Sequence, residues 1–121
     1  MSDATSAFVE LLPIRIERAE IEGPTLLIGG VDWSLSATCD WRWMSADGSV
    51  VSEGTPGRED LIWNLVGEQI VEVSWSRQDA LGRDPSFSLR SGGSLQVFSD
   101  ATYDTWVLHS PTLVLVGPLR S

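Results

Sequence analysis

Few side chains in this sequence could carry acid–base or nucleophilic chemistry. His109 is the single histidine and Cys39 the single cysteine. A general base needs a nucleophile and an orienting acid within reach, and no Gly-x-Ser-x-Gly or similar element surrounds a serine. Cys39 falls on the apolar face of a predicted strand, which favours a small buried side chain over a reactive thiol. We therefore predict a protein that is not an enzyme and has no catalytic residues.

Carboxylates are more numerous, but their spacing defines neither a metal site nor an acid–base pair. Asp100 and Asp104 bracket a loop and could hold a hard cation together with backbone carbonyls. Such aspartates more often accept hydrogen bonds from turn amides. The adjacent Glu59 and Asp60 lie in a predicted loop, which favours solvated side chains over a glycosidase-like pair. Without zinc-ligand spacing around the lone histidine and cysteine, the sequence predicts no metal ion and no cofactor.

The segment 98–106 places acidic and aromatic residues between two predicted strands. Interfaces commonly combine aromatic anchors with a polar rim. We therefore expect Asp100, Tyr103, Asp104 and Trp106 to bind a partner. The alternative is a simple strand connection whose aromatic side chains close the core.

The charge balance restricts the kind of partner. The 121 residues carry 17 acidic and eight basic side chains, a formal net charge of −9, and every basic residue is arginine. Eleven acids and four arginines in residues 1–60 give −7, whereas six acids and four arginines in 61–121 give −2. This balance disfavours binding to nucleic acid. Two roles for the negative charge remain, which are to keep the protein soluble or to attract a basic protein partner.

The elements that must position these residues are mainly strands, and the strongest pattern covers residues 31–43. Every second residue there is apolar, which predicts a strand with one buried face. The predicted buried face consists of Val31, Trp33, Leu35, Ala37, Cys39, Trp41 and Trp43. A straight strand of this length would span roughly 43 Å, against a radius of gyration near 14 Å for a chain of this size. We expect it to bend around Ala37–Cys39, and we expect the six tryptophans mainly in the core rather than in a surface patch.

Turn and helix signals divide the rest of the chain. Ser45–Gly48 and Ser91–Ser94 predict hairpin turns between strands. The only good helical spacing lies at 61–66, with acids before it and Gly67 as its C-terminal cap. The sequence predicts an α+β domain, mostly antiparallel, with about seven or eight strands in a single strongly curved sheet or open barrel and one short helix.

Length and terminal composition predict one domain over 1–121, with 1–7 flexible. The N-terminus lacks a basic and an apolar signal region, and no run approaches the ~20 apolar residues of a membrane span. We expect a cytoplasmic protein that does not bind membranes.

Several runs resemble a group of small uncharacterised bacterial proteins. These runs are LVGEQIVEVSW, a hairpin ending in LQVFSD, Trp106-x-Leu108 and a final Val-Gly-Pro, with DWSLSATCDWRWMSADGSVV before them. The resemblance covers most of residues 24–118 and implies no activity. Small acidic β-rich proteins of this kind are similar, by class only, to immunity proteins of bacterial toxin systems.

The function that we predict is non-enzymatic protein binding, in the manner of an immunity or antitoxin-type inhibitor that masks a basic surface. The alternative is a small-ligand-binding or oligomeric scaffold module in which tryptophans line a pocket. Self-association is compatible with both.

Overall fold

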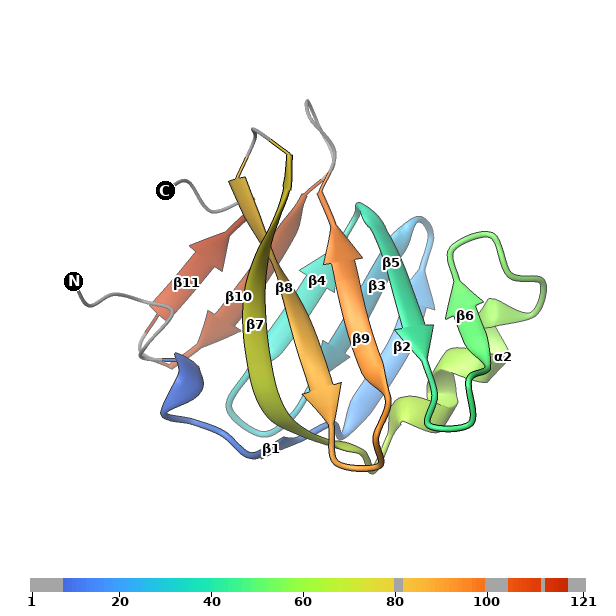
Figure 1. Cartoon of the computed structure of the whole chain (residues 1–121), viewed down its shortest axis with the longest axis horizontal. Helices are drawn as coiled ribbons and strands as arrows, with labels where there is room; N and C mark the ends of the chain where they lie inside the picture. The colour runs from blue at the N-terminus through green and yellow to red at the C-terminus, as the bar shows by residue number, and fades with distance from the viewer. Residues whose placement is uncertain (1–7, 80–81, 100–104, 112, 118–121) are drawn as a thin grey trace.

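The chain folds into two antiparallel sheets packed face to face (Figure 1). The computed structural model describes residues 8–79, 82–99, 105–111 and 113–117. The six-stranded sheet contains, in spatial order, β1 (Ile14–Arg15), β7 (Gln69–Asp79), β8 (Gly82–Leu89), β9 (Ser94–Phe98), β5 (Asp40–Met44) and β6 (Val50–Ser52). The five-stranded sheet contains β11 (Leu113–Val116), β10 (Trp106–Ser110), β4 (Ser34–Ala37), β3 (Thr25–Gly29) and β2 (Arg18–Glu22).

The long alternating segment crosses from one sheet to the other. It is divided into β4 in one sheet and β5 in the other, with a bend at Thr38 and Cys39. The Thr38 backbone N–H and hydroxyl both donate to the Thr105 carbonyl, at 2.9 and 3.1 Å. The predicted bend is confirmed, and its consequence is that one apolar face lines the core from both sheets.

The predicted fold class is confirmed as mostly antiparallel β-structure with one short helix. The described residues form eleven strands, more than the seven or eight that the pattern predicts, and they form two layers without a closed barrel. Part of this difference arises because segment 31–43 changes sheets, since each half then pairs with different neighbours.

The buried face of 31–43 is as predicted at six of seven positions. Trp33, Leu35, Ala37, Cys39, Trp41 and Trp43 are buried. The prediction is wrong for Val31, whose side chain is 78% exposed. Val31 lies in a bend before β4, where the alternation of a strand no longer determines which way a side chain points.

The helical segment predicted at 61–66 begins earlier and changes type. α2 (Arg58–Leu61) is one α-helical turn, and the 3₁₀ helix η1 (Ile62–Leu65) continues it. A 3₁₀ helix has three residues per turn, so Ile62 and Leu65 lie on one edge, and both are fully buried. Gly67 follows with φ +100°, as a C-terminal glycine should, and donates its N–H to the Ile16 carbonyl at 2.8 Å.

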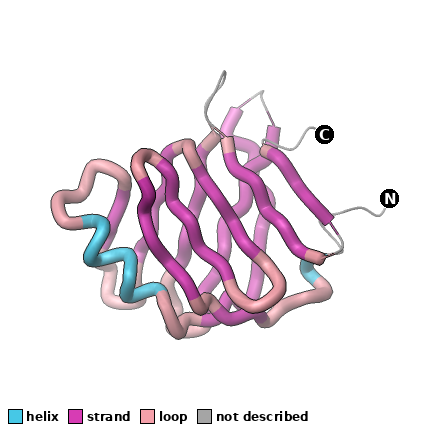
Figure 2. Tube along the Cα trace, turned by 180° about the vertical axis from the view of Figure 1, so that it is seen from behind, coloured by secondary structure: helices cyan, strands magenta, loops and turns pink. Residues whose placement is uncertain are grey.

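Together α2 and η1 cover one open side of the two layers. α2 contacts β6 at the edge of the six-stranded sheet, while η1 contacts β2 at the edge of the other. The cyan tube of this helical segment runs along this side in the view from behind (Figure 2, left). Within the described part of the chain, no helix is long and apolar enough to cross a membrane.

Candidate functional site

The predicted partner-binding residues are not brought together on the described surface. Asp100, Tyr103 and Asp104 lie outside the described residues. Trp106 begins β10 and is fully buried, and its indole N–H donates to Asp84 Oδ1 at 2.8 Å. Its ring lies against Gly117 so closely that a Cβ there would have no space. Trp106 therefore closes the core, as expected if segment 98–106 is a simple strand connection and not an interface.

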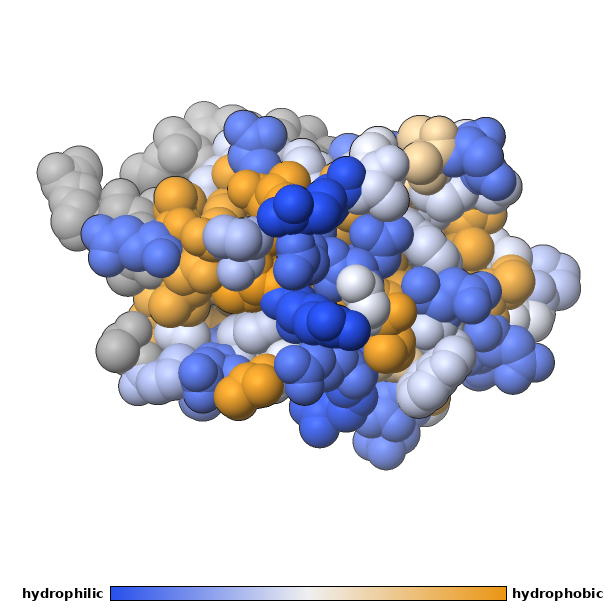
Figure 3. All heavy atoms as spheres, turned by 90° about the horizontal axis from the view of Figure 1, so that it is seen from below, coloured by the Kyte–Doolittle hydropathy of each residue, from blue (hydrophilic) through white to orange (hydrophobic). Residues whose placement is uncertain are grey.

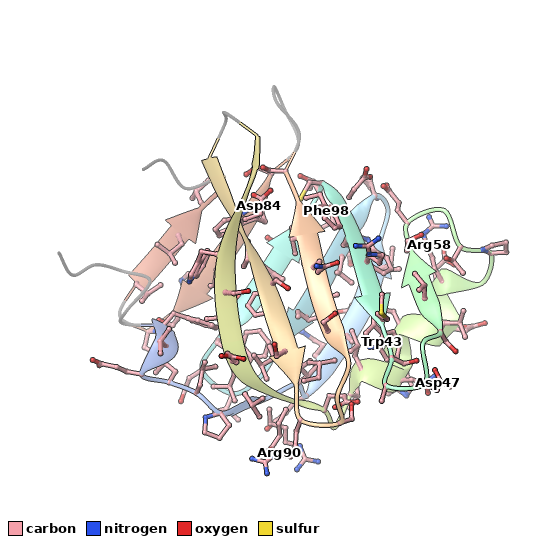
Figure 4. The ribbon with its side chains drawn as sticks, in the orientation of Figure 1. Trp43, Asp47, Arg58, Asp84, Arg90 and Phe98 are labelled. Carbon is pink, nitrogen blue, oxygen red and sulfur yellow. The ribbon has the colours of Figure 1, made fainter. Side chains whose placement is uncertain are left out.

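Asp84 is a buried carboxylate that spacing in the sequence did not single out. It belongs to β8, is 1% exposed, and lies near the upper end of that strand (Figure 4). Its Oδ2 accepts hydrogen bonds from the Ser99 backbone N–H at 2.9 Å and from the Ser99 hydroxyl at 3.1 Å. Since Oδ1 accepts from Trp106 in the opposite sheet, Asp84 joins the two layers through neutral donors.

Cys39 is buried close to this carboxylate. Burial, followed by the negative charge of Asp84, raises the pKa of the thiol from 9.0 to about 12. Both effects disfavour the thiolate, which is the reactive form of cysteine.

We expect the Cys39 thiol to react slowly with a thiol reagent in native buffer at pH 8 and rapidly in denaturant, because only unfolding exposes it. The folded thiol ionises near pH 12 and the unfolded one near 9.0, so raising the pH between these values should favour unfolding. Labelling time courses with and without denaturant measure the first effect. Fast labelling of the native protein would instead support a reactive thiol.

The described residues offer no arrangement typical of catalysis or metal binding. No group of three or more histidine, cysteine, aspartate or glutamate residues among them could hold a metal ion. His109 is exposed on β10, in register with Ser34 and Val114, and no described side chain gives its ring a hydrogen-bond partner. Neither of these register neighbours is the orienting acid that a catalytic histidine requires.

The strongest candidate surface is the α2–η1 ledge, defined as residues 58–65. One edge of the ledge, with Ile62 and Leu65, is buried, and the opposite edge faces solvent. On that exposed edge the relative exposure is 61% for Trp63 and 38% for Leu61. Trp63 is the most exposed tryptophan among the described side chains, whereas four other tryptophans are buried. Glu59 and Asp60 precede these apolar residues, and the Glu59 carboxylate lies 3.7 Å from Arg58. A signal for this exposure was present in the sequence, because the helical spacing of Leu61, Ile62, Leu65 and Val66 places Trp63 outside their apolar face.

A cleft of about 240 Å³ separates the ledge from the β5–β6 hairpin. Its lining consists of Trp43, Ser45, Ser49, Val51, Leu61 and Asn64. The indole N–H of Trp43 is buried and has no hydrogen-bond partner among the described residues. A buried donor of this kind costs about 1–3 kcal/mol when its acceptor is missing. The cleft wall therefore retains an unsatisfied donor within an otherwise packed core.

Asp47 supplies a fixed negative charge at the tip of the same hairpin. The Ser45 hydroxyl and the Ser49 backbone N–H donate to its Oδ1, and these hydrogen bonds lower its pKa to about 2. Both donor residues also line the cleft. Figure 4 shows Trp43, Asp47 and Arg58 at the same end of the molecule, on the hairpin and the ledge. The Asp47 carboxylate is ionised at neutral pH, as at its ordinary pKa, and the lowered pKa keeps it ionised in more acidic solution.

Two other surfaces are less well defined as sites. An open cleft of about 500 Å³ on the outer face of the six-stranded sheet contains Arg42, which donates to Gln96 Oε1 at 2.7 and 3.2 Å and lies over the Phe98 ring. At the end that carries β11, apolar side chains gather on the underside (Figure 3, left). Neither combines an exposed large aromatic side chain with a bounded cleft.

Comparison of this chain with protein-family models, with curated proteins and with solved structures found no match. The resemblance of residues 24–118 to small bacterial proteins therefore stays a prediction. The function has to be inferred from the geometry of the site itself.

Proposed function

We propose that this chain is an acidic protein-binding domain that uses the α2–η1 ledge to hold a basic protein partner. The observation that carries the proposal is Trp63, which projects to solvent between the buried residues of η1. Binding energy in protein interfaces concentrates in a few residues, and tryptophan is among the most frequent of them. The best-fitting class is an immunity or antitoxin-type inhibitor, which acts by covering its partner without chemistry of its own.

Charge supports a basic partner in particular. Glu59 and Asp60 flank the apolar part of the ledge, and Asp47 lies on the adjoining hairpin. These three carboxylates are opposed there by one guanidinium, that of Arg58. Together with the overall charge of −9, they favour rapid encounter with a positively charged surface and disfavour an acidic one.

The predicted residues Asp100, Tyr103 and Asp104 stay in the proposal as a second candidate region, outside the described part of the chain. The alternative function, a ligand-binding or scaffold module with a tryptophan-lined pocket, has weaker support. Trp33, Trp41, Trp43 and Trp106 are buried and pack into the core, so they leave no large aromatic cavity among the described residues.

We expect Trp63→Ala to weaken binding of the partner by at least about 2 kcal/mol, or roughly 30-fold in Kd, chiefly by faster dissociation. Val31→Ala is the matched control, because Val31 is also exposed and apolar but lies away from the ledge. Affinity purification from the organism that encodes the chain, followed by mass spectrometry, identifies the partner. Binding kinetics of the parent and both variants then measure the effect.

Salt dependence provides the second readout. Association should slow steeply between low and physiological ionic strength, because exposed charges act mainly on the encounter rate. A partner that binds Trp63→Ala as tightly as the parent would exclude the ledge as the interface. An association rate that is independent of salt would contradict the basic partner.

A further inference from the structure

We propose that β11 pairs with β11 of a second copy of this chain, so that the five-stranded sheets of two copies form one continuous antiparallel sheet. β11 lies at the outer end of its sheet (Figure 1), and among the described residues it pairs with β10 alone. The opposite edge of this sheet is β2, which contacts η1 of the α2–η1 ledge. The inference is therefore independent of the proposed function, because it concerns a different edge of the molecule.

The other edges of the two sheets are short, charged or covered, which are the usual means of preventing contact between sheets. β1 has two residues, and β7 carries the exposed Glu72 beyond its pairing with β1. β6 has three residues and contacts α2, whereas β2 contains three charged side chains and contacts η1. β11 differs from all of them, because its sequence is Leu-Val-Leu-Val, and Val114 and Val116 are each 55% exposed.

The hydrogen bonds to β10 show which backbone groups of β11 face outward. The Gly117 backbone N–H donates to the Trp106 carbonyl at 2.9 Å, directly after the pair of Val116 with Val107. Residues in antiparallel strands alternate between pairs that exchange hydrogen bonds and pairs that do not. Leu115 therefore faces β10, and the N–H and C=O groups of Val114 and Val116 point away from that strand, toward the outer edge of the sheet.

This arrangement is complementary to itself. A two-fold axis perpendicular to the sheet at Leu115 places Val114 opposite Val116 of the second copy, and Val116 opposite Val114 of that copy. Each of these pairs exchanges two backbone hydrogen bonds, because all four residues present their N–H and C=O groups to the other strand. The valine side chains then lie together on the outer face, where cross-strand β-branched pairs stabilise a sheet.

The distribution of charge favours a second copy at this edge over the basic partner proposed for the ledge. The strands β3, β4, β10 and β11 contain no aspartate, glutamate or arginine, although the chain has 17 acidic and eight basic residues. These strands therefore offer no carboxylate to attract a basic protein. Two copies that each carry a net charge of −9 repel one another, and contact through an uncharged edge keeps their carboxylates apart.

The first test is sedimentation velocity of the full chain at increasing concentration and at two salt concentrations. A four-residue edge buries much less than the ~800 Å² per partner of a stable dimer, so we expect a weak dimer that forms as the protein concentration rises toward about 1 mM. Added salt should strengthen the dimer, because it screens the repulsion between the two copies. This dependence on salt is opposite to that expected for a basic partner at the ledge.

Two substitutions and one control locate the contact. Val116→Lys and Val114→Lys should each weaken self-association at least about tenfold in Kd, because a charged side chain is then placed opposite a valine at the edge. Val31→Lys makes the same change of charge at a 78% exposed position before β4, away from β11, and should leave self-association unchanged. Each of these substitutions makes the chain less negative, so net charge alone does not predict weaker association in the β11 variants.

The register is tested by NMR on a mixture of ¹³C-labelled and unlabelled chains. We expect isotope-filtered contacts between the Val114 methyl groups of one copy and those of Val116 of the other.

Several results would overturn the proposal. A chain that stays monomeric throughout, or a dimer that forms equally well in the Val116→Lys and Val31→Lys variants, would exclude β11 as a self-pairing edge. A dimer without the Val114–Val116 contact would contradict the register. Loss of a different protein from Val116→Lys, with the parent chain monomeric, would assign this edge to that protein instead.

Discussion

Trp41→Ala should lower the free energy of unfolding by about 3–5 kcal/mol, because the substitution removes a large buried ring and leaves a cavity. Trp41 is the second residue of β5, buried on the face between the two sheets, in register with Val97. Its neighbours belong to a packed core that cannot close around the lost volume without strain. Chemical denaturation followed by far-ultraviolet circular dichroism measures the change.

Ser36→Ala is the matched control for this prediction. Ser36 lies on β4, in the other half of the same alternating segment, and its side chain is on the outer face. Its replacement should change the stability by no more than about 0.5 kcal/mol. Similar losses in both variants would mean that the two faces have been assigned incorrectly.

Asp84→Ala should produce the second large effect, a loss of about 2–5 kcal/mol. The substitution leaves the Trp106 indole N–H and the Ser99 backbone N–H without their acceptor, and each unsatisfied buried donor costs about 1–3 kcal/mol. It also removes a hydrogen bond that joins the two sheets. The free energy of unfolding in urea is the appropriate measurement.

Two further variants show whether the carboxylate itself matters. Asp84→Asn keeps one oxygen acceptor and presents an amide NH₂ to the remaining donors, so its stability should lie between those of Asp84→Ala and the parent. Asp40→Ala, at an exposed carboxylate, should be within about 0.5 kcal/mol of the parent. If all three variants were as stable as the parent, the buried network around Asp84 would not contribute to folding.

The proposed ledge and these two predictions concern different parts of the molecule. Trp41 and Asp84 are buried between the sheets, whereas Trp63 and Leu61 are exposed on the α2–η1 ledge. A variant that unfolds the protein will therefore also lose its partner, but Trp63→Ala should bind weakly while remaining folded. Measuring stability alongside binding separates the two causes.

The sequence by itself determined the properties that depend on local periodicity and turn chemistry. Alternation over 31–43 predicted the buried face, and the length of that segment required a bend near Thr38. Hairpin turns at 45–48 and 91–94 followed from glycine and small polar residues, and Gly67 marked the end of the helical segment. These predictions succeed because the chemistry that decides them lies within a few residues along the chain.

Only the tertiary structure decided how the strands divide into two sheets and which side chains meet across them. Asp84 accepts hydrogen bonds from Ser99 and Trp106, which lie 15 and 22 residues later in the sequence. No pattern along β8 indicates that the Asp84 carboxylate is buried. Trp63 is exposed because Ile62 and Leu65 turn inward in a 3₁₀ helix, and that choice is made by packing against the sheet edges. Such pairings depend on the free energy of bringing distant segments together, which local sequence periodicity does not encode.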